Sequence, residues 1–178
     1  MKASIKDWVR ATENLNIRRK QRESNDDNAR LNNAVRDYKS HITKCGFGDS
    51  VLDVGCGGQF LKQCLPESVE YIGIDAFPIV ENTVELAIED DKVLDYSVDT
   101  VCAFAVLDNC RDFYKACENM RKIAKKNVII LTGIGIDPDQ YHTFRLELEH
   151  FAKAFEGMDC THKELISPKV YLLCYTQR

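Results

Sequence analysis

A glycine-rich loop between two short apolar runs is the feature that most constrains the fold of this chain. Residues 51–54 are Val-Leu-Asp-Val and lead into Gly-Cys-Gly-Gly at 55–58. A helix-like segment, 59–65, follows, and a second apolar run, 69–75, ends in Asp75. Strand, helix and strand within roughly 30 residues define a βαβ unit. The sequence therefore predicts parallel strand pairing in an open α/β sheet.

The rest of the chain extends this sheet. Five more strands are expected at 83–87, 99–105, 127–131, 158–166 and 170–176, with helices at 111–125 and 143–155. The last two strands are separated only by a short turn at Ser167-Pro168, and such a turn joins antiparallel neighbours. The sequence thus predicts an α/β fold with a doubly wound, mostly parallel seven-stranded sheet and an antiparallel C-terminal strand.

The first 44 residues differ in charge from the rest. They carry 11 basic and 6 acidic side chains, net +5, whereas residues 45–178 carry 13 basic and 22 acidic ones, net −9. We expect two helices here, one starting at Ser4 and one at 24–27, with a solvated basic cluster at 18–22 between them. Apolar residues repeat at helical spacing on both: Ile5, Trp8, Val9, Thr12 and Leu15, then Leu31, Val35, Tyr38 and Ile42.

Composition narrows the class further. A chain of 178 residues with 44% apolar side chains fits one ordinary domain, which we divide into a helical N-terminal lid segment (1–44) and the sheet domain (45–178). It shows neither a signal peptide nor a membrane span, so a cytoplasmic protein is expected. The 8 cysteines include no C-x-x-C pair, which favours reduced thiols and no bound metal.

Asp75 lies 20 residues after Gly55, where an acid can hold both hydroxyls of a ribose. Nicotinamide and flavin enzymes use the same device, but two residues argue against them. Phe60 is too large for the position at which a dinucleotide fingerprint has its third glycine. Asp53 places a carboxylate beside the loop, where a pyrophosphate would be repelled. A ligand with a positive centre and no phosphate fits better.

These residues resemble the S-adenosylmethionine-dependent methyltransferases of the seven-stranded Rossmann-like superfamily, and in particular the small type 11 enzymes. The segment 51–57 is similar to their first motif, 71–75 to their second, and 96–101 and 107–110 to the sequences around their fourth strand. The resemblance covers about residues 45–178. The loop after Gly57 is one residue shorter than usual. No D/N-P-P-Y/F motif follows the fourth strand, which argues against methylation of DNA bases or protein glutamine.

The resemblance implies a site for S-adenosylmethionine, with S-adenosylhomocysteine as product. Gly55 and Gly57 would lie against the cofactor, Asp75 would hold its ribose and Asp53 would lie near its ammonium end. The acid that contacts adenine stays open between Glu85 and Glu89. The expected cofactor-binding residues are Asp53, Gly55, Cys56, Gly57, Asp75, Ala76, Glu85, Glu89 and Ala105.

Polar residues after the fourth and fifth strands are the catalytic candidates. Asp108 and Asn109 would face the acceptor or cap the helix at 111–125, and Tyr141 and His142 would supply a proton acceptor or simply pack. The predicted function is methyl transfer to a small-molecule, sugar or accessible side-chain acceptor. Nucleic acid is a less favoured partner, and the oligomeric state is open. The alternatives are a catalytically inactive, methyltransferase-like binding or partner subunit and a nicotinamide-linked oxidoreductase.

Overall fold

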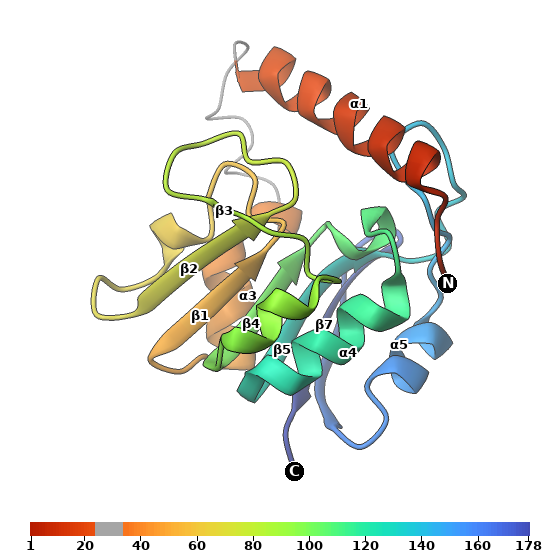
Figure 1. Cartoon of the computed structure of the whole chain (residues 1–178). Helices are drawn as coiled ribbons and strands as arrows, with labels where there is room; N and C mark the ends of the chain where they lie inside the picture. The colour runs from red at the N-terminus through yellow and green to blue at the C-terminus, as the bar shows by residue number, and fades with distance from the viewer. Residues whose placement is uncertain (24–33) are drawn as a thin grey trace.

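A computed structural model describes residues 1–23 and 34–178, and these form one seven-stranded sheet with helices on both faces (Figure 1). The strand order is β3-β2-β1-β4-β5-β7-β6. The strands are Ser50–Val54 (β1), Glu70–Asp75 (β2), Val84–Glu85 (β3), Val98–Phe104 (β4), Ala124–Gly133 (β5), Asp159–Ser167 (β6) and Val170–Thr176 (β7).

The strand directions confirm the predicted fold class. The strands from β3 to β5 pair in parallel, and β7 runs antiparallel to both β5 and β6. The turn between β6 and β7 is one residue later than predicted, because Ser167 is the last residue of β6 and pairs with Val170. Lys169 completes the turn with φ +66. Strand order reverses between β1 and β4, so their carboxyl ends border the crevice in which open α/β sheets bind ligands.

The helices cover the two faces separately (Figure 1). They are Ile5–Glu23 (α1), Tyr38–Cys45 (α3), Phe113–Ile123 (α4) and Leu148–Ala154 (α5), with short 3-10 turns at Ala34–Arg36 (η1), Lys62–Cys64 (η2), Asp91–Asp95 (η3) and Leu107–Asn109 (η4). Helices α4 and α5 pack on the face that contains Leu52 and Val54, whereas α3 packs on the face that contains Val51. Alternating side chains of each strand therefore enter two different cores.

Several predicted elements were wrong in extent. The helix expected at 59–65 is reduced to the single turn η2, because Gly57 (φ +51) and Gln59 (φ +54) keep the backbone out of the helical region. Helix α4 ends at Ile123 because Ala124 already pairs with Val98 of β4. The last helix starts at Leu148 rather than at 143, and β3 is shorter than the predicted strand 83–87.

Helix α1 also differs from the prediction. It begins after Ser4, whose hydroxyl accepts a hydrogen bond from the Asp7 N–H (3.1 Å), as expected of a cap. It then continues to Glu23, so the backbone of the basic cluster 18–22 is helical rather than a link between two helices. The second helix start, at 24–27, and Leu31 lie outside the described residues. Helix α3 begins later, where Asp37 accepts from the Ser40 N–H at 3.0 Å.

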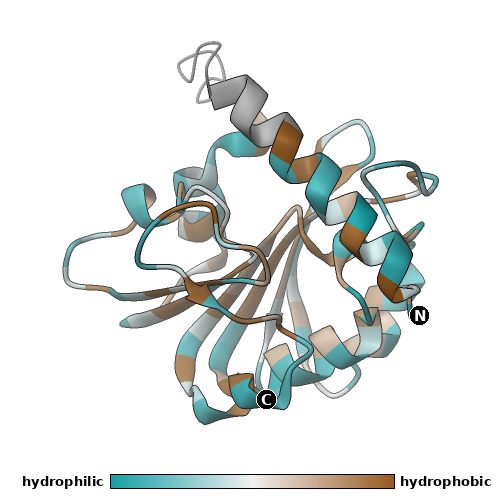
Figure 2. Ribbon diagram, turned by 45° about the horizontal axis from the view of Figure 1, so that its top comes forward, coloured by the Kyte–Doolittle hydropathy of each residue, from teal (hydrophilic) through white to brown (hydrophobic). Residues whose placement is uncertain are grey.

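The chain start fixes α1 over the carboxyl ends of the strands. The Ala3 N–H donates to the Arg111 carbonyl (2.7 Å) and the Phe113 N–H to the Met1 carbonyl (3.0 Å). In Figure 1 the helix lies across the upper edge of the sheet, and in Figure 2 polar and apolar residues alternate along it. Among the described residues, no helix combines the length and apolar character needed to cross a membrane. All 8 cysteines are free thiols.

One buried histidine makes the stability of this fold depend on pH. His41 of α3 is 2% exposed and burial lowers its pKa, although the Val35 carbonyl, 3.3 Å from Nε2, offsets part of that effect. Below about pH 6.5 His41 therefore binds a proton in the unfolded chain more readily than in the folded protein. The free energy of unfolding consequently falls as the pH decreases through this range. When the pH is lowered from 7.5 to 5.5, we expect the melting temperature of His41→Leu to fall less than that of the wild type. An equal loss in both proteins would contradict this role.

Candidate active site

The glycine loop turns sharply at the carboxyl end of β1. Gly55 has φ +63, and a Cβ at this position would overlap the side chain of Val106. The Gly57 N–H donates to Asp75 Oδ2 at 3.1 Å. Position 55 therefore requires glycine, both for its left-handed backbone conformation and for its close contact with Val106. The loop consequently presents bare backbone to the space between β1 and β4.

Asp75 is held at the end of β2 by backbone donors. Besides the bond from Gly57, its Oδ1 accepts from the Phe77 N–H at 2.9 Å, and the residue is 7% exposed. These bonds orient the carboxylate beside the glycine loop. An acid in this position can accept hydrogen bonds from two vicinal hydroxyl groups.

Asp53 lies on the opposite side of the loop. Its side chain belongs to the sheet face covered by α3, where it accepts a hydrogen bond from the Tyr71 hydroxyl at 2.8 Å. Burial raises its pKa to about 7, the charge of Asp75 adds to this increase, and the bond from Tyr71 opposes it. A group with this pKa is partly protonated at neutral pH, which differs from the fixed negative charge that the sequence suggested.

A cavity of about 60 Å³ lies between the glycine loop and α1, and we call it the glycine-loop cavity. Its lining residues are Trp8, Thr12, Leu15, Asn16, Val54, Gly55, Asp75, Ala76, Leu86, Ala87, Ile88, Glu89, Ala105, Val106, Asn109 and Cys110. The walls therefore come from the ends of β1, β2 and β4, the segment after β3, and α1.

This cavity brings together five of the nine expected cofactor-binding residues: Gly55, Asp75, Ala76, Glu89 and Ala105. The other four do not line it: Asp53, Cys56, Gly57 and Glu85. Glu89 is 6% exposed and its Oε1 accepts from the backbone N–H groups of Arg111 and Asp112, whereas Glu85 is exposed. Of the two acids left open for adenine, only Glu89 borders the cavity.

Ala105 has an unusual backbone for an alanine. Its φ of +55 lies in the left-handed region, and its N–H donates to the Leu131 carbonyl at 2.7 Å. Such strain concentrates at sites where the chain must pass close to a ligand. Its position in the wall at the end of β4 agrees with that pattern.

The polar groups of the cavity suit a nucleoside-containing cofactor. The side-chain oxygens of Asn16 and Asn109 are buried without a hydrogen-bond partner in the described structure. Both residues line the cavity, so a ligand there would meet two unused acceptors as well as Asp75 and the bare backbone at Gly55. Ligand pockets usually measure about 300 to 1,000 Å³, so this cavity must widen to admit a nucleoside.

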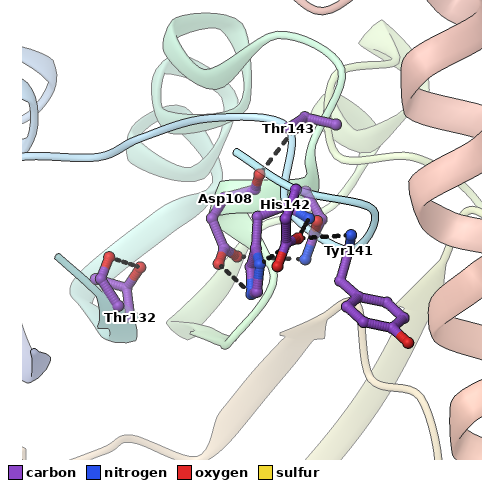
Figure 3. A network of polar contacts seen from close by, with 8 residues as sticks. Asp108, Thr132, Tyr141, His142 and Thr143 are labelled. Carbon is purple, nitrogen blue, oxygen red and sulfur yellow. Dashed lines mark hydrogen bonds and ion pairs between the residues drawn. The ribbon is translucent and has the colours of Figure 1, made fainter. Parts of the chain in front are cut away.

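The predicted catalytic residues form a chain of polar contacts (Figure 3). His142 Nδ1 lies 2.8 Å from Asp139 Oδ1, and His142 Nε2 lies 3.6 Å from Asp108 Oδ2. Asn109 Nδ2 donates to Asp108 Oδ1 at 3.4 Å. The bond to Asp139 favours the tautomer that carries its proton on Nδ1. Since 3.6 Å is too long for a hydrogen bond, Nε2 keeps its lone pair for another partner.

Asp108 is almost fully enclosed at this point. Burial raises its pKa, and the neighbouring His142 opposes the increase. Its backbone carbonyl accepts from the Thr143 N–H (2.9 Å) and hydroxyl (2.8 Å), which ties the loop after β5 to η4. Neither Asp108 nor Asn109 caps α4, because that cap is Asp112, which accepts from the Lys115 N–H.

Tyr141 occupies the same loop but points elsewhere. Its N–H donates to Asp139 Oδ1 at 2.7 Å, and Figure 3 shows its ring directed away from the Asp108–His142 pair. The structure thus joins Asp108, Asn109 and His142, and leaves the Tyr141 hydroxyl apart from them.

A second, larger cavity of about 960 Å³ opens beside His142, and we call it the N-terminal cavity. It is lined by Met1, Lys2, Ala3, Ser4, Asp7, Arg10, Asn14, Pro138, Asp139, Gln140, His142, Thr143 and Phe144. The polar contacts from Asn109 through Asp108 to His142 therefore connect the walls of the two cavities.

Sequence reasoning expected the N-terminal segment to act as a lid, but it assigned none of its residues to the cofactor site. The structure places Trp8, Thr12 and Leu15 in the wall of the glycine-loop cavity. Sequence reasoning also missed Asp139, whose position three residues before His142 resembles an Asx turn. A carboxylate at this spacing could have indicated an oriented histidine.

The sheet order and the site at its switch point define an α/β protein of the methyltransferase type. A family model described as a methyltransferase domain matches residues 12–169, and the chain belongs to this family of S-adenosylmethionine-dependent methyltransferases. S-adenosylmethionine is accordingly its cofactor. No curated protein matches the chain.

Solved structures share the fold at low sequence identity. A methyltransferase from Aquifex aeolicus is 16% identical with a TM-score of 0.65, covering 88% of this chain and 96% of that one. The 1,6-didemethyltoxoflavin-N1-methyltransferase of Burkholderia thailandensis is 12% identical with a TM-score of 0.64, covering 94% and 90%. Magnesium protoporphyrin IX methyltransferase from Synechocystis PCC 6803, with bound S-adenosylhomocysteine, is 14% identical with a TM-score of 0.64, covering 81% and 82%.

Proposed function

We propose that this protein methylates a small-molecule or sugar acceptor that enters through the N-terminal cavity, while the cofactor occupies the glycine-loop cavity. The observation that carries the proposal is the contact chain between the two cavities, in which Asn109 borders one and His142 borders the other. Because methyl transfer requires the acceptor atom to reach the sulfonium methyl directly, the two ligands would have to meet beside this chain of contacts. Two structural neighbours are named for small-molecule substrates, which is consistent with this acceptor class.

The cofactor, when bound, supplies a methyl group that is already activated on a sulfonium. The protein then has to align the acceptor, exclude water and remove a proton. Gly55, Asp75 and Ala105 would hold the cofactor. His142, oriented through Nδ1 by Asp139, would accept at Nε2 the proton of an acceptor hydroxyl. The buried Asp108, 3.6 Å away, would then stabilise the imidazolium that forms.

The N-terminal segment fits the role of a lid. Helix α1 lines both cavities, and the bonds from Met1 and Ala3 anchor its start beside α4. A lid in this position would exclude water from both ligands at once. A nucleic-acid acceptor remains the less favoured alternative, because the N-terminal cavity mixes acidic with basic side chains rather than presenting a basic groove.

Calorimetry with S-adenosylhomocysteine tests the cofactor site. We expect one site per chain, and the ligand should raise the melting temperature, because it binds only the folded state. NAD, tested in parallel, should give no binding heat and should not raise the melting temperature. Release of S-adenosylhomocysteine from S-adenosylmethionine in the presence of small hydroxylated acceptors then tests the acceptor class. Absence of both heat and thermal shift at millimolar S-adenosylhomocysteine would contradict the proposal.

A further inference from the structure

Helix α1 presents different faces to the two cavities. Trp8, Thr12, Leu15 and Asn16 line the glycine-loop cavity, whereas Asp7, Arg10 and Asn14 line the N-terminal cavity. Residues three or four apart lie on one side of a helix, so each set forms a separate stripe. The first stripe faces Asp75 and Gly55 across the cavity, outside the segment that resembles methyltransferase motifs.

Asn16 has an unused acceptor on that stripe. Its Oδ1 is buried and has no hydrogen-bond partner within the described residues. A buried polar group without a partner costs free energy, so most such groups are paired in folded proteins. The neighbouring Asn14 differs, because its amide donates to the Gln140 carbonyl at 3.0 Å. The two asparagines are therefore the same residue type on one helix, with only Asn16 lacking a partner.

The surroundings of this stripe favour the nucleoside part of a ligand. The Trp8 ring lies 5.3 Å from the ring of Phe77, and the Phe77 N–H is bound to Asp75. Trp8 thus lies beside the acid that we assign to the ribose. Leu15, Leu86 and Ala76 add apolar wall. A flat base would pack well against these groups.

We propose that Asn16 is a cofactor-binding residue whose Oδ1 accepts a hydrogen bond from the nucleoside part of S-adenosylmethionine, with Trp8 of the same helix in the wall beside it. This inference rests on the proposed function. The glycine-loop cavity measures only about 60 Å³, so its walls, of which α1 is one, must separate further to admit the cofactor. The helix is consequently part of the cofactor site as well as a cover for it.

Paired asparagine variants test this assignment by calorimetry. Asn16→Ala should weaken the binding of S-adenosylhomocysteine roughly 5- to 30-fold, the effect of losing one buried hydrogen bond. Asn14→Ala is the matched control and should change the dissociation constant less than threefold. Melting temperatures without ligand establish that both variants fold. Equal affinity of Asn16→Ala and the wild type would overturn the inference, while failure of the wild type to bind would instead contradict the proposed function.

A truncated ligand identifies the part of the cofactor that is bound. 5′-Methylthioadenosine contains the nucleoside without the amino-acid group, so Asn16→Ala should weaken it by the same factor as S-adenosylhomocysteine. A loss confined to S-adenosylhomocysteine would overturn the nucleoside assignment. Trp8 is the only tryptophan, and its fluorescence should change when either ligand binds. An unchanged spectrum under saturating ligand would contradict the position of Trp8 in the wall.

Discussion

Replacing His142 with alanine is expected to lower turnover of a hydroxyl acceptor by roughly 100-fold or more, the usual contribution of a positioned general base. The expectation follows from geometry, because Asp139 holds Nδ1 at 2.8 Å and leaves Nε2 without a hydrogen bond. Cofactor affinity should stay the same, since His142 lines the N-terminal cavity and not the glycine-loop cavity. Steady-state turnover and calorimetry with S-adenosylhomocysteine measure the two effects separately.

A second histidine, which lines neither cavity, distinguishes catalysis from packing, because its replacement by alanine should leave turnover unchanged. His162→Ala is the control, because its imidazole pairs with Glu164 on the edge strand β6, 3.0 Å away. A fully active Asp108→Ala, His142→Ala double variant would show that the cluster is structural.

The central sheet could be predicted because its signals are local. Two short apolar runs on either side of the loop with Gly55 and Gly57 predict two parallel strands, and Asp75 ends the second run. The element ends could not be predicted equally well. Gln59 adopts φ +54, and its amide donates to the Thr83 hydroxyl at 2.9 Å, a contact between segments far apart in sequence. Such long-range bonds replaced the expected helix with turns.

The site was predictable only where the residues follow a strand. Gly55 and Ala105 come directly after β1 and β4, and Asp75 is the last residue of β2. Asn109 follows β4 in the turn η4, and the parallel sheet brings these ends together. Asp53 carried the same sequence signal, but the alternation of side chains along β1 places it on the other face. The role of Asn16 depends on where α1 packs. That position is set by backbone bonds near Arg111, and no local pattern reveals it.

Asp75 should have the largest single effect on cofactor binding. Asp75→Ala removes a carboxylate that accepts hydrogen bonds from the backbone N–H groups of Gly57 and Phe77. Among the described residues, this is the only carboxylate between the glycine loop and the segment after β2. We expect the affinity for S-adenosylhomocysteine to fall by about 1 to 3 kcal/mol, or roughly 5- to 150-fold, through loss of charge-assisted bonds to the ribose. Calorimetry measures this change directly.

Two variants separate ligand contact from support of the loop. Asp75→Asn keeps one oxygen acceptor and much of the shape, so it should bind more weakly than the wild type but more tightly than Asp75→Ala. Glu85→Gln removes the neighbouring acid, which pairs in register with Asp75 on β3 but does not line the cavity, and it should bind like the wild type. If Asp75→Ala loses thermal stability yet keeps its affinity, the carboxylate only braces the loop, and the ribose must be held by other groups.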